Sequence, residues 1–89
     1  MPLLSILIPS VPNRHSQLHS LFKNLAWQVE NYGDDVEVLV LLDNKKRSIG
    51  LKRQSLLDIA KGTYVTWIDD DDEPDMDYVY EVMEVLHGS

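Results

Sequence analysis

The sequence of 89 residues contains no cysteine, which excludes a disulfide framework, a thiolate zinc site and a cysteine nucleophile. No apolar run approaches the ~20 residues of a membrane-spanning helix, and the first five residues lack the basic region of a signal peptide. The four glycines are scattered, so no glycine-rich loop is present to cradle a phosphate. The missing membrane span and signal peptide predict a cytoplasmic protein, and the length predicts a single domain over residues 1–89.

The negative charge of the chain is concentrated in one segment. The formal net charge is −7, from 15 acidic and 8 basic residues, and seven of the acids lie within residues 69–77. Five of the bases lie within residues 45–53. The overall sign of the charge disfavours an extended nucleic-acid interface. A tight acidic cluster together with a tight basic one indicates a site for a metal ion and an anion.

Apolar patterning predicts three strands that alternate with three helices. The expected strands are apolar runs typical of buried parallel strands, at residues 3–9, 36–42 and 63–68. The expected helices run from Asn13 to about Gly33, from Ser48 to about Lys61, and from Pro74 to Gly88. We expect the second helix to bury Leu56, Leu57 and Ala60. This alternation predicts an α/β fold with a small parallel sheet, helices on both faces and therefore three layers.

Ligands of parallel sheets bind beyond the carboxyl ends of the strands, and three short segments stand at these ends of the predicted strands. They are Pro9-Ser10-Val11 after the first strand, Asp43-Asn44 after the second and Asp69 to Asp72 after the third. The unusual chemistry of the sequence is therefore expected along one edge of one sheet.

Four consecutive aspartates cannot share one environment, because side chains alternate along a strand and buried carboxylates repel one another. A divalent cation removes that repulsion, and Mg²⁺ is commonly held by one or two carboxylates together with substrate phosphates. The alternative is a solvated acidic turn that also caps the next helix. The position of the run directly after the apolar pair Trp67-Ile68 favours the metal site.

The basic residues offer a complementary site for an anion. Lys52 or Arg53, near the start of the second helix, is a candidate to hold a diphosphate. Arg53 is the better candidate because it lies one turn inside that helix. The basic residues 45–47 are expected to form a solvated loop.

Four segments together carry a family resemblance through their order and spacing. They are Leu4 to Ser10; Val36 to Asp43; Gly50 through Arg53 to Val65; and Ile68 to Asp72 followed by Pro74-Asp75. Over nearly its whole length, the chain resembles the amino-terminal, nucleotide-sugar-binding half of glycosyltransferase family 2, whose members have the Rossmann-like GT-A fold.

The resemblance implies a role for each matching residue. Pro9, Ser10 and Val11 would line the base and ribose, Asp43 would hydrogen-bond the base, expected to be uracil, and Arg53 would contact the nucleotide. Asp69 and Asp71 fit the family's DxD pattern. Asp69 and Asp70 would then face the nucleotide-sugar, while Asp71 and Asp72 would bind the Mn²⁺ or Mg²⁺ that bridges the diphosphate. The run of four leaves this register open by one residue.

The resemblance also implies a reaction and an architecture. Family members transfer a sugar from a nucleotide-sugar, here expected to be a UDP-sugar, to an acceptor hydroxyl. Only a short loop separates Asp43 from Gly50, where the family usually has a further helix and strand, so the expected strand order is 2-1-3. The acceptor-binding half with its catalytic base is missing from these residues, and we expect a truncated GT-A domain.

The open edge of the third strand leads us to expect a homodimer, because unpaired edges pair with other chains. One alternative function is a non-catalytic remnant that associates with proteins through this edge. Another is an acidic metal-binding module unrelated to sugars.

Overall fold

Three parallel strands alternate with three α-helices in the computed structural model, which describes residues 2–11, 15–42 and 49–88. The elements are β1 (Leu4–Ser10), α1 (His15–Val29), the 3₁₀ helix η2 (Glu30–Asp35), β2 (Val36–Leu42), α2 (Ile49–Ile59), β3 (Tyr64–Trp67) and α3 (Tyr78–His87). Within these ranges, none of the helices has the length and apolar character needed to cross a membrane.

The sheet has the strand order β2-β1-β3, and both of its ladders are parallel. Leu4 on the central strand lies opposite Val36 and Tyr64, so the three strands start level. β1 is the central strand because its apolar side chains can be buried on both faces. The parallel sheet and its order are thus as predicted, and the arrangement is compatible with a Rossmann-like fold.

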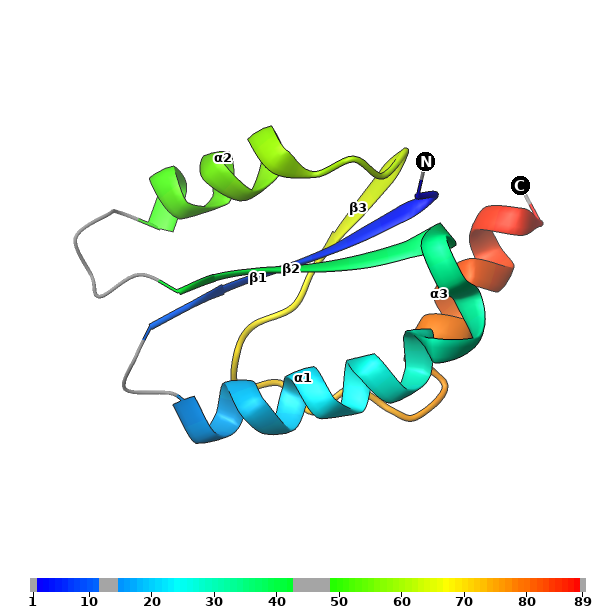
Figure 1. Cartoon of the computed structure of the whole chain (residues 1–89), viewed down its shortest axis with the longest axis horizontal. Coiled ribbons are helices and arrows are strands. Elements are labelled where there is room, and N and C mark those ends of the chain that lie inside the picture. The colour runs from blue at the N-terminus through cyan, green and yellow to red at the C-terminus, as the bar shows by residue number, and fades with distance from the viewer. Residues whose placement is uncertain (1, 12–14, 43–48, 89) are drawn as a thin grey trace.

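The helices cover the two faces of the sheet unequally. Figure 1 shows α1 and α3 on one face and α2 alone on the other. The larger core lies under α1 and α3 and consists of Leu4, Ile6, Ile8, Leu21, Leu25, Val36, Ile68, Val79 and Met83. Leu56 of α2 is also fully buried, but Leu57 is 42% exposed, so the prediction that Leu57 faces inward is wrong. The inward position is taken by Lys52, one turn before Leu56.

The last helix begins at Tyr78 and not at Pro74, as the sequence suggested. The segment before it has other partners for its backbone. The Tyr78 amide donates to the Asp75 carbonyl over 3.0 Å. The Gln28 side chain on α1 donates a hydrogen bond to the same carbonyl and accepts one from the Val79 amide. Contacts with α1 therefore hold residues 74–77 in an irregular path that leads away from β3.

A hydrogen-bonded group joins the α2–β3 connection to the start of the sheet. The Ser5 hydroxyl donates to Oε2 of Glu37 over 2.5 Å and accepts from the Gly62 amide over 2.8 Å. The same Glu37 oxygen accepts from the Lys61 amide over 2.7 Å. These three bonds join β1, β2 and the residues before β3 at the amino ends of the strands. They help to position β3, which leads into the four aspartates.

Candidate functional site

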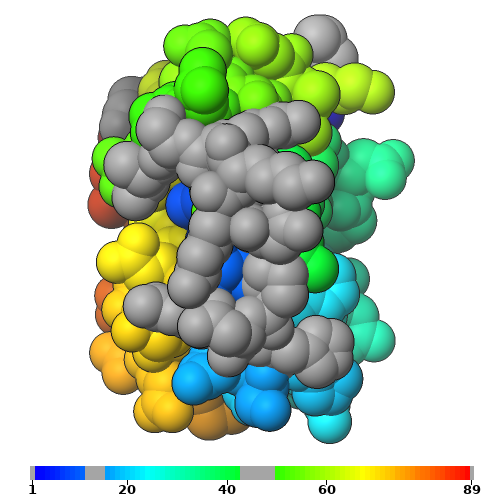
Figure 2. Space-filling model, turned by 90° about the vertical axis from the view of Figure 1, so that its left-hand side faces the viewer, coloured from blue at the N-terminus to red at the C-terminus, as the bar shows by residue number. Residues whose placement is uncertain are grey.

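The carboxyl ends of the strands lie at one edge of the molecule, as predicted. Figure 2 faces this edge: α2 runs along the top, the first turns of α1 lie at the bottom, and the residues after β3 lie to one side between them. β1 ends at Ser10, and β3 ends at Trp67, directly before the aspartates. Asp43, the residue expected to bind the base, lies outside the described residues.

Asp70 turns inward while its three neighbours face solvent. Asp70 is 5% exposed, and its Oδ2 accepts a 2.8 Å hydrogen bond from the hydroxyl of Ser10, which is itself buried. Asp69, Asp71 and Asp72 are exposed. Ile68 before them is buried and Asp69 is exposed, and the turn at Asp70 and Asp71 then leaves Asp71 and Asp72 in solvent. The expectation that four consecutive aspartates would not share one environment is confirmed.

A buried lysine approaches the same serine from the other side. Lys52 is 7% exposed, and its Nζ donates to the Ser10 carbonyl oxygen over 3.4 Å. Ser10 thus contacts a carboxylate through its hydroxyl and an ammonium through its backbone. Charged side chains are rarely this buried without a compensating partner, and here opposite charges meet at one residue. Lys52 is therefore a buried residue that contacts the carboxyl end of β1.

Arg53, the preferred candidate for the anion, is exposed, and its guanidinium carbon lies 5.4 Å from the ring centroid of Trp67. At this distance the cation is attracted by the face of the indole. The contact holds Arg53 beside the end of β3, next to the segment that carries the aspartates.

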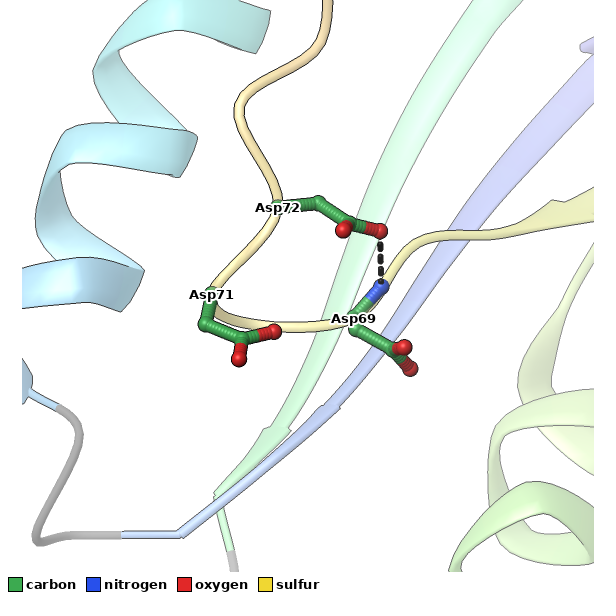
Figure 3. Close-up of side chains that lie close together, drawn as sticks. All are labelled: Asp69, Asp71 and Asp72. Atoms are coloured by element: carbon green, nitrogen blue, oxygen red, sulfur yellow. Dashed lines mark hydrogen bonds between the residues drawn. The ribbon is translucent and has the colours of Figure 1, made fainter.

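The three exposed aspartates, Asp69, Asp71 and Asp72, form an acidic triad on the turn after β3 (Figure 3). One carboxylate oxygen from each lies within 4.8 Å of the others. Oxygens that share one cation lie at most about 4–5 Å apart, twice the metal–oxygen distance, so the triad can converge on a divalent ion. The turn is closed by two bonds, from the Asp69 amide to Oδ2 of Asp72 over 3.2 Å and from the Asp72 amide to the Asp69 carbonyl over 3.1 Å.

A groove of about 700 Å³ lies beside the triad. One wall is the segment 71–76, which includes Asp71 and Asp72, and the other is the polar side of α1. That polar side carries Ser16, Ser20 and Asn24, which are spaced by four residues and so share one helix face. Sequence reasoning missed this wall because a polar helix face usually faces only water. The four-residue spacing was the signal that could have found it.

The side-chain amides of Gln28 and Asn24 on α1 hold the segment 71–76, one wall of the groove, in place. Gln28 is 6% exposed; its Nε2 donates to the Asp75 carbonyl over 2.8 Å, and its Oε1 accepts from the Val79 amide over 2.8 Å. Asn24 donates to the Pro74 carbonyl over 3.1 Å. These contacts join α1 to the segment between the acidic triad and α3. A buried polar group with this many partners makes the segment rigid.

The structure brings some of the sequence-predicted residues together and separates others. Asp69, given to the nucleotide-sugar by the resemblance, groups with Asp71 and Asp72, given to the metal. Ser10 and Asp70 are buried against each other, and Pro9 and Val11 on either side of Ser10 are half-buried.

The fold and the site define a small parallel α/β domain with clustered carboxylates at the carboxyl edge of its sheet. Comparisons with protein-family models, curated proteins and solved structures found no significant match to the chain.

Proposed function

We propose that this chain binds a nucleoside-diphosphate sugar together with Mn²⁺ or Mg²⁺, as the donor-binding half of a glycosyltransferase that resembles family 2. The observation that carries the proposal is the acidic triad at the carboxyl end of β3, with three carboxylate oxygens within 4.8 Å and a groove beside it. The family resemblance of the sequence motifs supplies the substrate class.

The triad favours a cation for a physical reason. Three exposed carboxylates this close repel one another, and a divalent ion turns that repulsion into attraction. Mg²⁺ and Mn²⁺ accept oxygen ligands and keep positions for the oxygens of a phosphate. A bound ion would neutralise the charge that develops on the leaving diphosphate during sugar transfer.

The chain's own residues would bind and orient the donor. In the proposed site the half-buried Pro9 and Val11 line the base and ribose, the buried Ser10 between them supports them, and Asp43 accepts a hydrogen bond from the base. The exposed guanidinium of Arg53 approaches a phosphate. Ser10 owes its position to the bonds with Asp70 and Lys52, which fix the end of β1.

Isothermal titration calorimetry of UDP into the protein with MnCl₂ tests the proposal. We expect binding in the micromolar to millimolar range that disappears when EDTA replaces the metal. GDP and dTDP in the same titration test the choice of base. No heat with any of the three nucleotides in the presence of Mn²⁺ or Mg²⁺ would refute the proposal.

A pair of double variants tests the residues. Asp71→Asn with Asp72→Asn should abolish the metal-dependent binding and leave the far-ultraviolet circular dichroism spectrum unchanged. Asp34→Asn with Asp35→Asn changes the net charge equally at two exposed aspartates of η2 and should leave binding intact. If the first pair only stabilises the protein and no nucleotide binds, the triad is a solvated acidic turn.

A second candidate function is association through the open edge of β3. Within the described residues β3 pairs only with β1, and Tyr64 and Val65 on it are 46% and 40% exposed. Light scattering after size-exclusion chromatography would detect a homodimer. Val65→Lys should dissociate it, because a charge on an edge strand opposes pairing, whereas the Asp71/Asp72 variant should remain dimeric. A monomer at all concentrations would refute this function.

A further inference from the structure

A hollow of about 270 Å³ lies between the end of α1, η2 and the start of α3. Its lining includes three aromatic side chains, one methionine and two carboxylates, Trp27, Tyr32, Tyr80, Met76, Glu30 and Asp77, besides the amides of Gln28 and Asn31. We call it the aromatic hollow. It shares only Met76 with the groove beside the acidic triad, so it is a separate feature of the surface.

The apolar side chains of the aromatic hollow are unusually open to solvent. Trp27 and Tyr80 are each 57% exposed, and Met76 is 66% exposed. A single exposed apolar side chain is ordinary in a folded protein, but three gathered around one concavity are typical of a binding site. The volume suits a small headgroup or the end of a side chain, since sites for larger ligands span about 300–1,000 Å³.

The two carboxylates decide the charge of the ligand. Among the described residues, the side chains of Glu30 and Asp77 make no hydrogen bond or ion pair, and Asp77 stands before α3 without capping it. An anion would be repelled by them. A neutral apolar ligand would remove water from the carboxylates and offer no hydrogen bond or charge in its place. A cation is attracted both by the carboxylates and by the faces of the aromatic rings.

We infer that the aromatic hollow binds a quaternary or methylated ammonium group. Such a cation combines a positive charge with an apolar methyl surface, so it can contact Trp27, Tyr32 and Tyr80 without losing a strongly held water shell. An unmethylated lysine ammonium is more strongly hydrated and fits less well. The chain's net charge of −7 adds a favourable long-range field for any cation. The methylated ammonium can come from a choline-type small molecule or from a trimethyllysine side chain.

Fluorescence of Trp27 provides the test, because the chain has only two tryptophans and Trp67→Phe leaves Trp27 as the single reporter. Choline should change its emission in a saturable way. The uncharged isostere 3,3-dimethyl-1-butanol should bind at least about tenfold more weakly, which corresponds to ~1.4 kcal/mol. If Trp67→Phe fails to fold, the shift of the Trp27 indole N–H resonance in the wild-type chain gives the same measurement.

Parallel titrations with choline and with an Nε-trimethyllysine amide distinguish the two sources, and the tighter ligand identifies the source. Equal response to choline and its uncharged isostere, or no saturation with either cation, would overturn the inference. The outcome is independent of nucleotide binding, since neither ligand uses the acidic triad.

Matched variants locate the effect. Tyr80→Ala should remove most of the choline response, while Tyr64→Ala, at an exposed tyrosine on β3, should leave it unchanged. Glu30→Gln with Asp77→Asn should weaken binding several-fold at low salt and less at high salt, because salt screens exposed charges. Glu81→Gln with Glu84→Gln removes two exposed charges of α3 outside the hollow and serves as the control. Equal loss in the control pair would contradict a role for Glu30 and Asp77.

Discussion

The hydroxyl of Ser10 donates a 2.8 Å hydrogen bond to Oδ2 of Asp70, and this bond joins the last residue of β1 to the turn that follows β3. Both residues are buried, and Lys52 reaches the carbonyl of the same serine. One aspartate of the four is therefore used to fix the turn, and the other three are presented to solvent as the acidic triad.

Replacement of Ser10 by alanine removes the donor of this bond. Because the bond has a buried carboxylate as acceptor, we expect Ser10→Ala to lower the free energy of unfolding by about 1.5–3 kcal/mol in urea denaturation. Ser20→Ala on the exposed face of α1 is the control and should change it by less than ~0.5 kcal/mol. Equal stability of the two variants would mean that Asp70 does not depend on Ser10.

Gln28 provides a second link between distant parts of the chain, from α1 to the segment before α3. Gln28→Leu keeps the size of the side chain but leaves the buried Val79 amide without the Gln28 acceptor, while the Asp75 carbonyl loses one of its two donors and keeps the Tyr78 amide. We expect a loss of about 1–3 kcal/mol, chiefly from the unsatisfied Val79 amide. Gln17→Leu, at an exposed glutamine of the same helix, should leave stability within ~0.5 kcal/mol.

Hydrogen exchange separates this local role from a general loss of stability. In Gln28→Leu the Val79 amide should lose more protection than the amides of β1, which lie in the centre of the sheet. A uniform loss of protection over both elements would argue against a specific attachment of the segment to α1.

The parts of the fold that depend on local patterns could be predicted from the sequence. β1 and β2 are apolar runs typical of parallel strands, β1 buried and β2 half-buried at the edge, and their alternation with helices predicts a parallel sheet with helices on both faces. That the four aspartates would differ in environment was also predictable, but the burial of Asp70 itself depends on Ser10, 60 positions earlier.

The parts that depend on contacts between distant residues could not be predicted. Nothing local to Pro74 indicates that its segment is held by Gln28, 46 positions earlier, so the sequence predicts a helix start at residues that form an irregular path. The prediction that Leu57 lies on the inward face of α2 is wrong for a similar reason. Lys52 looks like a surface residue until the Ser10 carbonyl is placed beside its ammonium, and Leu57 looks like a core residue until the single helix on that face is seen to leave it uncovered.

Gly62 packs against the backbone of β1, and this contact predicts the effect of adding one methyl group. A Cβ at Gly62 would lie 2.5 Å from the Ser5 Oγ and 2.6 Å from the Ser5 amide nitrogen. Gly62→Ala should therefore destabilise the protein by about 1–3 kcal/mol, as overpacked sites do. Adding Ser5→Ala should not restore stability, because the clash with the backbone nitrogen remains. Full rescue in the double variant would show that only the hydroxyl is crowded.

Glu37, which binds Ser5 and the Lys61 amide, makes the stability of this part of the fold depend on pH. Partial burial raises its pKa, but the hydrogen bond from the Ser5 hydroxyl, the bond from the Lys61 amide and the charge of Lys61 outweigh burial, so the pKa of Glu37 lies below its ordinary value of 4.5. A carboxylate whose pKa is lower in the folded state stabilises the fold above the unfolded-state pKa. That contribution is lost as the pH falls through the folded-state value.

Glu37→Gln should accordingly be less stable than the wild-type chain at neutral pH, by on the order of 1 kcal/mol for weakened hydrogen bonds. The difference should shrink as the pH falls below 4.5, where the wild-type carboxylate becomes protonated. Urea denaturation of both proteins between neutral pH and about pH 3 measures this, and the subtraction removes the contribution of the acidic triad, which is common to both. Glu84→Gln, at an exposed glutamate of α3, is the control and should show no such convergence. A constant difference between wild type and Glu37→Gln at every pH would mean that the charge of Glu37 has no part in holding the α2–β3 connection.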